Sequence, residues 1–242
     1  MTVFDAWAGL ALPVVCLLLL LIAAMRAPAQ RHARVAREGG TVFLGEGLMH
    51  RGYAWIDRLA RLALRLGFTA DTVSWISLLL GLCAGAAAAG GHFGAAAWLL
   101  ALSGLGDGMD GAMARQQGTP TRGGAVLDSA LDRYVEFAFI AGLVWFYRGA
   151  PEVQMLALFA LLGSFMITYS TAKAEALQVT PPRGWMKRAE RMVWFTGGAA
   201  VASALPLAGF SGRPVLVGVL AVIAVFANLS AVIRLFALSR SV

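Results

Sequence analysis

Apolar residues fill the chain in long stretches, and polar residues gather in the short segments between them. A helix that crosses a bilayer needs about 20 predominantly apolar residues. Stretches that approach this length predict one N-terminal membrane-spanning helix and a set of six more. They cover residues 6–25, 72–90, 93–114, 124–147, 153–173, 190–208 and 214–236.

The first stretch, Ala6 to Met25, has no basic segment before it. A secretory signal peptide begins with such a segment, so we interpret this stretch as a retained anchor. Four arginines follow it, which we place on the cytoplasmic side: Arg26, Arg31, Arg34 and Arg37. Residues 1–40 are therefore expected to form a transmembrane anchor with a basic linker, and residues 41–242 the main membrane domain.

The segment GEGLMHRGYAWIDRLARLALRLG, residues 45–67, has the period of an amphipathic helix. Its expected apolar face is made of Leu48, Trp55, Leu59, Leu62, Ala63 and Leu66, and Arg51, Arg58, Arg61 and Arg65 lie largely off that face. Such a helix lies in the membrane interface with its arginines near anionic headgroups. A helix that faces only water is the alternative. The fold class is thus an all-α integral membrane protein, with a six-helix core, this interfacial helix and one extra anchor.

The composition agrees with lipid as the solvent, because 59% of the 242 residues are hydrophobic and 14% are charged. The net charge of +7, from 20 basic against 13 acidic residues, predicts cytoplasmic loops that face anionic lipid rather than a nucleic-acid partner. In the expected topology only Arg148 and Arg213 occupy outer loops. The protein is therefore expected in the cell membrane. Cys16 and Cys83 lie within apolar runs and predict neither a disulfide framework nor a metal site.

Four aspartates interrupt this apolar pattern at the cytoplasmic ends of two consecutive helices. Asp107 and Asp110 are three residues apart, and Asp128 and Asp132 are four apart, so each pair shares one helix face. The polar, turn-rich link QQGTPTRGG, residues 116–124, lets the two helices present their pairs to each other.

Four carboxylates in one place repel each other and need positive charge nearby. A structural cluster with Arg115 and Arg133 is one explanation, and an ion or metal transporter is another, because intramembrane acids also mark ion pathways. Against a transporter, the acids lie near one end of the bilayer, and few other polar residues line a path. An oxygen-only ligand set favours Mg²⁺ or Mn²⁺ over Zn²⁺.

Eight positions within 26 residues resemble the signature of the CDP-alcohol phosphotransferases: Asp107, Asp110, Gly111, Ala114, Arg115, Gly124, Asp128 and Asp132. With the helix count, the resemblance covers approximately residues 45–237. It implies a six-helix, usually homodimeric membrane enzyme with two metal ions, Mg²⁺ or Mn²⁺. It further implies that Asp107, Asp110, Asp128 and Asp132 contact the metals and that Asp132 is the general base.

The resemblance also implies where the donor nucleotide and diphosphate bind. The implied residues are Gly111, Ala114, Arg115, Thr121 and Gly124, together with Asp71, Thr72 and Ser74 of the stretch FTADTVSWISL. Asp71 stands where the family more often has Asn, and Ser74 where it more often has Thr.

A basic segment between the fourth and fifth core helices bears on the acceptor. It is similar to a segment of bacterial phosphatidylinositol phosphate synthases, with matches at Tyr169, Ala172, Ala174, Glu175, Arg188, Glu190 and Arg191. Thr171 and Lys173 stand where that pattern has arginines. The acceptor-binding residues expected are Lys173, Arg188, Arg191 and Arg133. Positive-inside charge with an Arg188, Glu190 and Arg191 surface network is the alternative explanation.

The expected function is transfer of a phosphatidyl group from a CDP-linked lipid, such as CDP-diacylglycerol, to the hydroxyl of a polar alcohol, with release of CMP. The acceptor is expected to be phosphorylated, with inositol phosphate and glycerol 3-phosphate as candidates and an unphosphorylated alcohol still open. The partners are then these two substrates, the bilayer and a second copy of the chain. A membrane transporter stays as the alternative.

Overall fold

The computed structural model describes residues 2–26, 46–118, 121–180 and 184–240, and these are helical between short turns, with no strand in those ranges. Of the described residues, Val3–Arg26 (α1) and Glu46–Arg65 (α3) form helices that precede the core. The core helices are α4 (Ala70–Ala89), α5 (Phe93–Gln116), α6 (Arg122–Phe146), α7 (Pro151–Ala176), α8 (Arg188–Ala204) and α9 (Arg213–Ser239). This confirms the all-helical fold class and places a helix at each expected stretch.

The fifth core helix ends earlier than its apolar stretch, residues 190–208, predicts. The regular helix α8 stops at Ala204, and Leu205–Ala208 tighten into a short 3-10 turn, η1. Pro206 lies inside that turn and has no N–H for a hydrogen bond to the preceding helix turn, which favours the end of the regular α-helix here.

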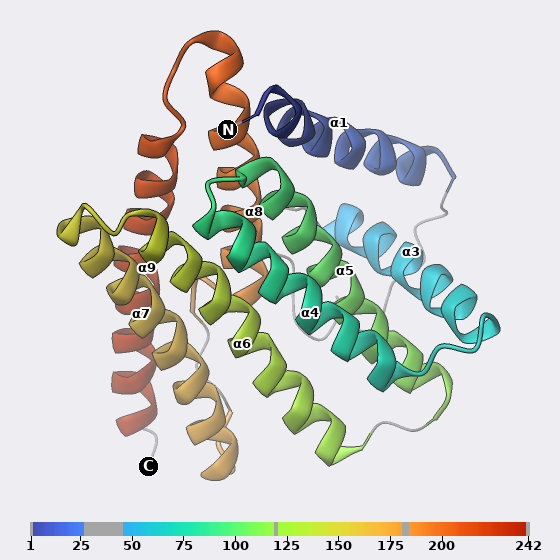
Figure 1. Ribbon diagram of the computed structural model, residues 1–242. Coiled ribbons are helices and arrows are strands. Elements are labelled where there is room, and N and C mark those ends of the chain that lie inside the picture. The colour runs from blue at the N-terminus through green and yellow to red at the C-terminus, as the bar shows by residue number, and fades with distance from the viewer. Residues whose placement is uncertain (1, 27–45, 119–120, 181–183, 241–242) are drawn as a thin grey trace.

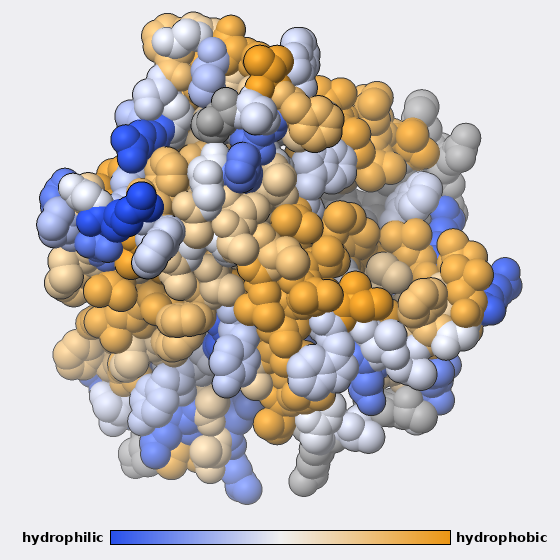
Figure 2. All heavy atoms as spheres, in the orientation of Figure 1, coloured by the Kyte–Doolittle hydropathy of each residue, from blue (hydrophilic) through white to orange (hydrophobic). Residues whose placement is uncertain are grey.

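Within the described ranges, four helices are long and apolar enough to cross a membrane by themselves: α1, α4, α7 and α9. The helices α5 and α6 carry the aspartates and other charged residues within their apolar stretches, and α8 has only 17 residues. The chain is an integral membrane protein. Figure 2 shows a broad apolar band across one face, as expected for a surface in contact with lipid.

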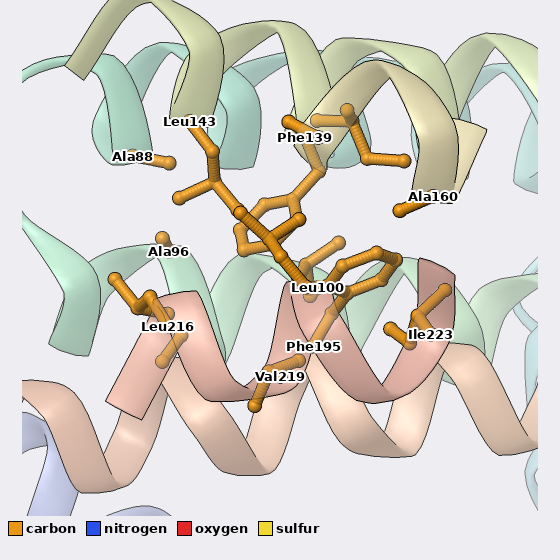
Figure 3. Close-up of a cluster of buried hydrophobic side chains, with 14 of the residues drawn as sticks. Ala88, Ala96, Leu100, Phe139, Leu143, Ala160, Phe195, Leu216, Val219 and Ile223 are labelled. Atoms are coloured by element: carbon orange, nitrogen blue, oxygen red, sulfur yellow. The ribbon is translucent and has the colours of Figure 1, made fainter. Parts of the chain in front are cut away.

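The core helices meet around a continuous apolar cluster in which large side chains interlock (Figure 3). Phe139 of α6 and Phe195 of α8 lie with ring centroids 5.2 Å apart. Leu100 of α5 and Ile223 of α9 complete this contact, and all four side chains are almost fully buried. The cluster therefore joins helices that are distant in the sequence and holds their ends in a fixed arrangement.

The helices α4 and α6 approach so closely that their backbones touch. A Cβ atom at Gly85 would clash with the carbonyl of Ala138, and one at Gly142 would clash with the carbonyl of Gly85. Small residues allow this approach, as in many membrane-helix pairs. The small-residue run GLCAGAAAAGG, residues 81–91, thus serves packing within the chain at this contact.

The amphipathic helix α3 lies against α5 and the start of α4. Its buried face is made of small residues, Ala60 and Ala63, which pack against Val73, Ala112 and Met113. The prediction assigned its larger leucines to the same face, but Leu62 and Leu66 are exposed. The helix therefore has two apolar surfaces: one packs on the core, where Ile56 and Leu64 are partly buried beside the two alanines, and the other is exposed. The exposed leucines suit contact with lipid.

The N-terminal helix α1 is joined to the core by polar contacts at its start. Asp5, 4% exposed, accepts a hydrogen bond at Oδ1 from the backbone N–H of Ala95 at 3.0 Å. The indole of Trp98 donates to the carbonyl of Ala8 at 2.8 Å. The N-cap residue of α5, His92, makes no side-chain cap bond, so Asp5 supplies that acceptor from another helix. The expected boundary between residues 40 and 41, and most of the basic linker, lie outside the described residues.

We predict that Asp5→Ala lowers the free energy of unfolding by about 1 kcal/mol, because the α5 amide loses its acceptor. Asp5→Asn is the matched control, since its side-chain oxygen can still accept that bond. Thermal unfolding of the purified protein in detergent measures both variants. Equal melting temperatures for the alanine variant and the wild type would show that the contact contributes nothing.

Candidate active site

The expected hairpin brings the two aspartate pairs together. Helix α5 ends at Gln116, and α6 begins at Arg122 after the N-cap residue Thr121, whose hydroxyl accepts from the Gly124 amide at 2.9 Å. Asp107, Asp128 and Asp132 each offer a carboxylate oxygen, and these oxygens lie within 4.8 Å of one another. The two helices therefore face their acids toward each other, as the spacing predicts.

Asp110 lies beside this three-carboxylate group and is bound from a third helix. Its side chain is 6% exposed, and Oδ2 accepts a hydrogen bond from Ser74 Oγ of α4 at 2.6 Å. The predicted nucleotide residue Ser74 thus contacts a carboxylate in this structure. This bond links the start of α4 to the end of α5, which Figure 1 shows side by side.

Arg188, at the first turn of α8, brings a positive charge into contact with these acids. Its Nη1 lies 2.8 Å from Asp107 Oδ2, and its Nη2 lies 2.6 Å from Asp132 Oδ1. The side chains of Arg188, Asp107 and Asp132 are between 16% and 26% exposed, so the ion pairs are accessible from outside. The Nε of Arg188 is buried without a hydrogen-bond partner.

The two arginines that sequence spacing offered as neutralising charges occupy other positions. Arg133 donates from Nη1 to the carbonyl and the hydroxyl of Ser129 in its own helix. Arg115 is exposed at the end of α5. A neutralising charge comes instead from Arg188, 56 residues beyond Asp132 in the sequence, because the fold places the start of α8 opposite the end of α5 and the start of α6.

The residues present suit a divalent metal ion. The three clustered groups are carboxylates, and the lining of the small hollow that they share adds hydroxyl oxygens from Ser74, Ser77 and Ser103. Hard cations such as Mg²⁺ and Mn²⁺ prefer oxygen ligands of this kind. Each acid would cost about 2.5–3.5 kcal/mol at the centre of a membrane helix, which favours a bound cation here.

The residues expected to bind the donor lie at three adjoining helix ends. Asp71 and Thr72 are exposed in the first turn of α4, where the hydroxyls of Thr69 and Thr72 lie 2.8 Å apart. Gly111 and Ala114 are half-buried on the last turns of α5, and Thr121 and Gly124 are exposed at the start of α6. Helix N-termini present backbone N–H groups that bind anionic groups such as phosphates.

The residues expected to bind the acceptor divide into two groups. Lys173 is exposed in the last turn of α7, and Arg188 faces the carboxylates. Arg191 is 1% exposed and donates to Glu136 from Nε at 2.6 Å and from Nη2 at 2.8 Å, so its guanidinium is already occupied. It forms no surface network. Glu190 instead caps the start of α8 by accepting from the Lys187 amide.

Arg234 of α9 is a candidate that the sequence analysis did not single out. It is 6% exposed, its Nε is buried without a hydrogen-bond partner, and its Nη1 lies 3.4 Å from Thr171 Oγ1. A buried guanidinium with open donors is suited to an anionic ligand. Its position within an apolar helix stretch was the only signal in the sequence, since intramembrane arginines are rarely without function.

Ser74→Ala should weaken Mn²⁺ binding about tenfold, because the hydroxyl that orients the Asp110 carboxylate is lost. Ser103→Ala is the matched control: Ser103 also lines the hollow, but its hydroxyl donates to the carbonyl of Ser77. Asp128→Asn should weaken binding further, because it removes a ligand. Electron paramagnetic resonance of free Mn²⁺ during titration measures all three, and equal affinities for the two serine variants would contradict the role given to Ser74.

Comparison with known proteins identifies the family. The CDP-alcohol phosphatidyltransferase family pattern matches residues 68–233. The phosphatidylinositol phosphate synthase of Mycobacteroides abscessus is 40% identical over 152 residues, which span 58% of this chain and 66% of that protein.

Two crystal structures of the Mycobacterium tuberculosis phosphatidylinositol phosphate synthase share the fold. The one in complex with manganese and citrate has a TM-score of 0.68 and 31% sequence identity, and covers 76% of this chain and 88% of its own. The one with CDP-DAG bound has the same TM-score, 30% identity and coverages of 76% and 92%. On the family match, the chain belongs to the CDP-alcohol phosphatidyltransferase family.

Proposed function

We propose that the protein transfers a phosphatidyl group from CDP-diacylglycerol to an inositol phosphate and releases CMP. The observation that carries this proposal is the placement of Arg188 against Asp107 and Asp132, which puts a cation for an anionic substrate beside the carboxylate cluster. The similar proteins are named as phosphatidylinositol phosphate synthases, and one was crystallised with CDP-DAG. These likenesses support a transferase and do not support the transporter that the sequence left open.

The donor's cytidine diphosphate is proposed to bind where α4 and α6 begin and α5 ends. Gly111 leaves space beside the guanidinium of Arg115, since a Cβ there would lie 3.2 Å from Nη1. Arg115 can pair with a phosphate oxygen, because its planar guanidinium donates in parallel pairs. Asp71, Thr72, Ser74, Ala114, Thr121 and Gly124 complete this proposed surface. The acyl chains of the donor would stay in the bilayer.

Two divalent cations, Mg²⁺ or Mn²⁺, would be held by Asp107, Asp110, Asp128 and Asp132. When bound, they supply positive charge to the diphosphate and so stabilise the charge that develops on the departing CMP.

The acceptor hydroxyl oxygen attacks the phosphorus that carries the diacylglycerol. The bond from this phosphorus to the bridging oxygen breaks, and CMP leaves with the electron pair. Asp132 takes the hydroxyl proton as general base, since its carboxylate lies 2.6 Å from Arg188, the arginine proposed to bind the acceptor. Holding both substrates in line converts an encounter in solution into a reaction within one complex.

The acceptor's phosphate is proposed to bind Arg188 and Arg234, with Lys173 at the entrance. Arg188 and Arg234 each have a buried Nε without a hydrogen-bond partner, so each has a donor available for a ligand. A phosphate oxygen paired with such donors forms charge-assisted bonds, which are stronger than neutral ones. The guanidinium of Arg191 is already paired with Glu136, so we do not assign it a direct contact with the acceptor. Arg133 lies on the same helix as Asp132 and stays a candidate ligand.

We further propose that all six core helices, α4 to α9, cross the membrane and that α1 crosses beside them. Arg148 and Arg213 lie at the end opposite the carboxylates, where the Tyr147 hydroxyl donates to the Arg213 carbonyl at 2.7 Å. Loops rich in lysine and arginine face the cytoplasm. The carboxylate end, where α4, α6 and α8 begin, is therefore assigned to the cytoplasmic face, where soluble acceptor arrives. A homodimer is expected from the family resemblance.

The acceptor is tested by CMP release from CDP-diacylglycerol with Mg²⁺ or Mn²⁺ and a panel of inositol phosphate, glycerol 3-phosphate, inositol and glycerol. Inositol phosphate should give the highest kcat/KM. Free inositol should be at least about tenfold slower, because it cannot make charge-assisted bonds to the arginines. Faster turnover of glycerol 3-phosphate would overturn the choice of acceptor, and absence of CMP release with every acceptor would overturn the transferase.

Asp132→Asn should lower kcat by about 10²–10⁴-fold, because an amide cannot accept the hydroxyl proton. Binding of CDP-diacylglycerol, measured by calorimetry, should stay close to that of the wild type. Glu152→Gln is a suitable control, since Glu152 is an exposed acid in the first turn of α7, at the far end of the molecule. Turnover of Asp132→Asn at the wild-type rate would exclude it as the base.

A further inference from the structure

A second ion pair connects α6 and α8 behind the carboxylate cluster. Arg191 contacts Glu136 through two hydrogen bonds of 2.6 and 2.8 Å, and the two side chains are 1% and 2% exposed. Neither residue lines the hollow that contains the aspartates. Because both are sealed from that hollow and from solvent, neither can touch a substrate.

The two ion pairs stand in register along the helices. Glu136 follows Asp132 by four residues on α6, and Arg191 follows Arg188 by three on α8. Residues at these intervals share a helix face. The open pair, Asp132 with Arg188, therefore lies one turn from the closed pair, Glu136 with Arg191. The closed pair fixes how far α8 is shifted along α6, and so where Arg188 stands relative to Asp132.

Arg191 also holds the turn that leads into α8. Its remaining nitrogen, Nη1, donates to the carbonyl of Met186 at 2.6 Å. Met186 is buried and has a φ of 56°, a left-handed conformation that is uncommon for residues other than glycine. Such conformations persist only where the surroundings enforce them, and they cluster at functional sites. Ser230 of α9 adds a second restraint by donating to the Trp185 carbonyl at 2.8 Å.

The same turn confines the second arginine of the proposed acceptor site. Gly184 packs against Arg234 so closely that a Cβ at this position would clash with Arg234 Nε and with Ser230 Oγ. A shift of the turn would therefore change the position of Arg188, at the start of α8, relative to Arg234 on α9. Both of these arginines carry the unpartnered Nε atoms that point to an anionic ligand.

We propose that Glu136 and Arg191 are positioning residues for the acceptor: through α8 and the turn at Met186 they set the distance between Arg188 and Arg234 and thereby the affinity for the acceptor's phosphate. The proposal rests on the proposed function for the identity of that ligand. It replaces the expectation that Arg191 itself binds the acceptor.

The test compares the wild type with Arg191→Lys and with the double variant Glu136→Leu/Arg191→Met, in the full-length protein. Replacing both charges by apolar residues of similar volume avoids leaving one buried charge unpaired. The acceptor KM of the double variant should rise by about tenfold to a hundredfold, as expected when binding groups are displaced. The donor KM should stay within about twofold, because the donor residues lie on other helix ends.

Arg191→Lys keeps a cation for Glu136 but has no second nitrogen for the Met186 carbonyl. Its acceptor KM should therefore lie between that of the wild type and that of the double variant. If the double variant does not fold, this variant supplies the same comparison. An unchanged acceptor KM in a folded variant overturns the proposal. A lower kcat with both KM values unchanged also overturns it, because the pair would then act on the chemical step.

Tyr147→Phe is the matched control, since it removes a buried hydrogen bond at the opposite end of α6 and should leave the acceptor KM unchanged. A second readout needs no turnover: trypsin should cleave after Lys187 faster in both Arg191 variants, because the turn is less restrained. Cleavage of both variants at the rate of the wild type would contradict the role of Arg191 in the turn. If the wild type uses no acceptor in the panel, the proposed function fails, while the cleavage rates still decide this inference.

Discussion

Negative charge placed within a membrane protein must be balanced inside the fold, and this constraint organises the molecule. Asp107 and Asp132 share the guanidinium of Arg188, Glu136 is paired with Arg191, and Asp110 accepts from Ser74. These partners come from α4 and α8, so the acids on α5 and α6 determine which helices must meet. In the part of the chain that the structure describes, α1, α4, α7 and α9 are apolar enough to cross lipid alone, and the charged helices α5, α6 and α8 pack against them.

The two arginines of α8 meet this constraint in different ways. Arg191 is sealed, and each of its nitrogens has a partner within the chain. Arg188 is partly open and retains a donor without a partner. A sealed pair can only hold structure, whereas an open pair can exchange one partner for a ligand or an ion. Residues three positions apart on one helix thus have separate roles because of burial alone.

Spacing along the chain was sufficient to predict the helices and the convergence of the aspartates, since both depend on neighbours in sequence. The partners of those aspartates were not predictable in the same way. Arg188 and Ser74 reach them only because the packed core sets which helix ends meet, and Arg191 turns inward to an acid of another helix. The face of α3 was predicted in part, because hydropathy cannot distinguish small residues that pack on protein from large ones that meet lipid.

The contact between Asp5 and the start of α5 bears on where the folding unit begins in the sequence. The family similarity begins at residue 68, yet α5, which carries Asp107 and Asp110, receives an acceptor for its first turn from α1. A fragment limited to the shared stretch would leave the Ala95 amide and the Trp98 indole without these acceptors. The stretch that folds as one unit is therefore longer than the stretch that the family shares, because it includes α1.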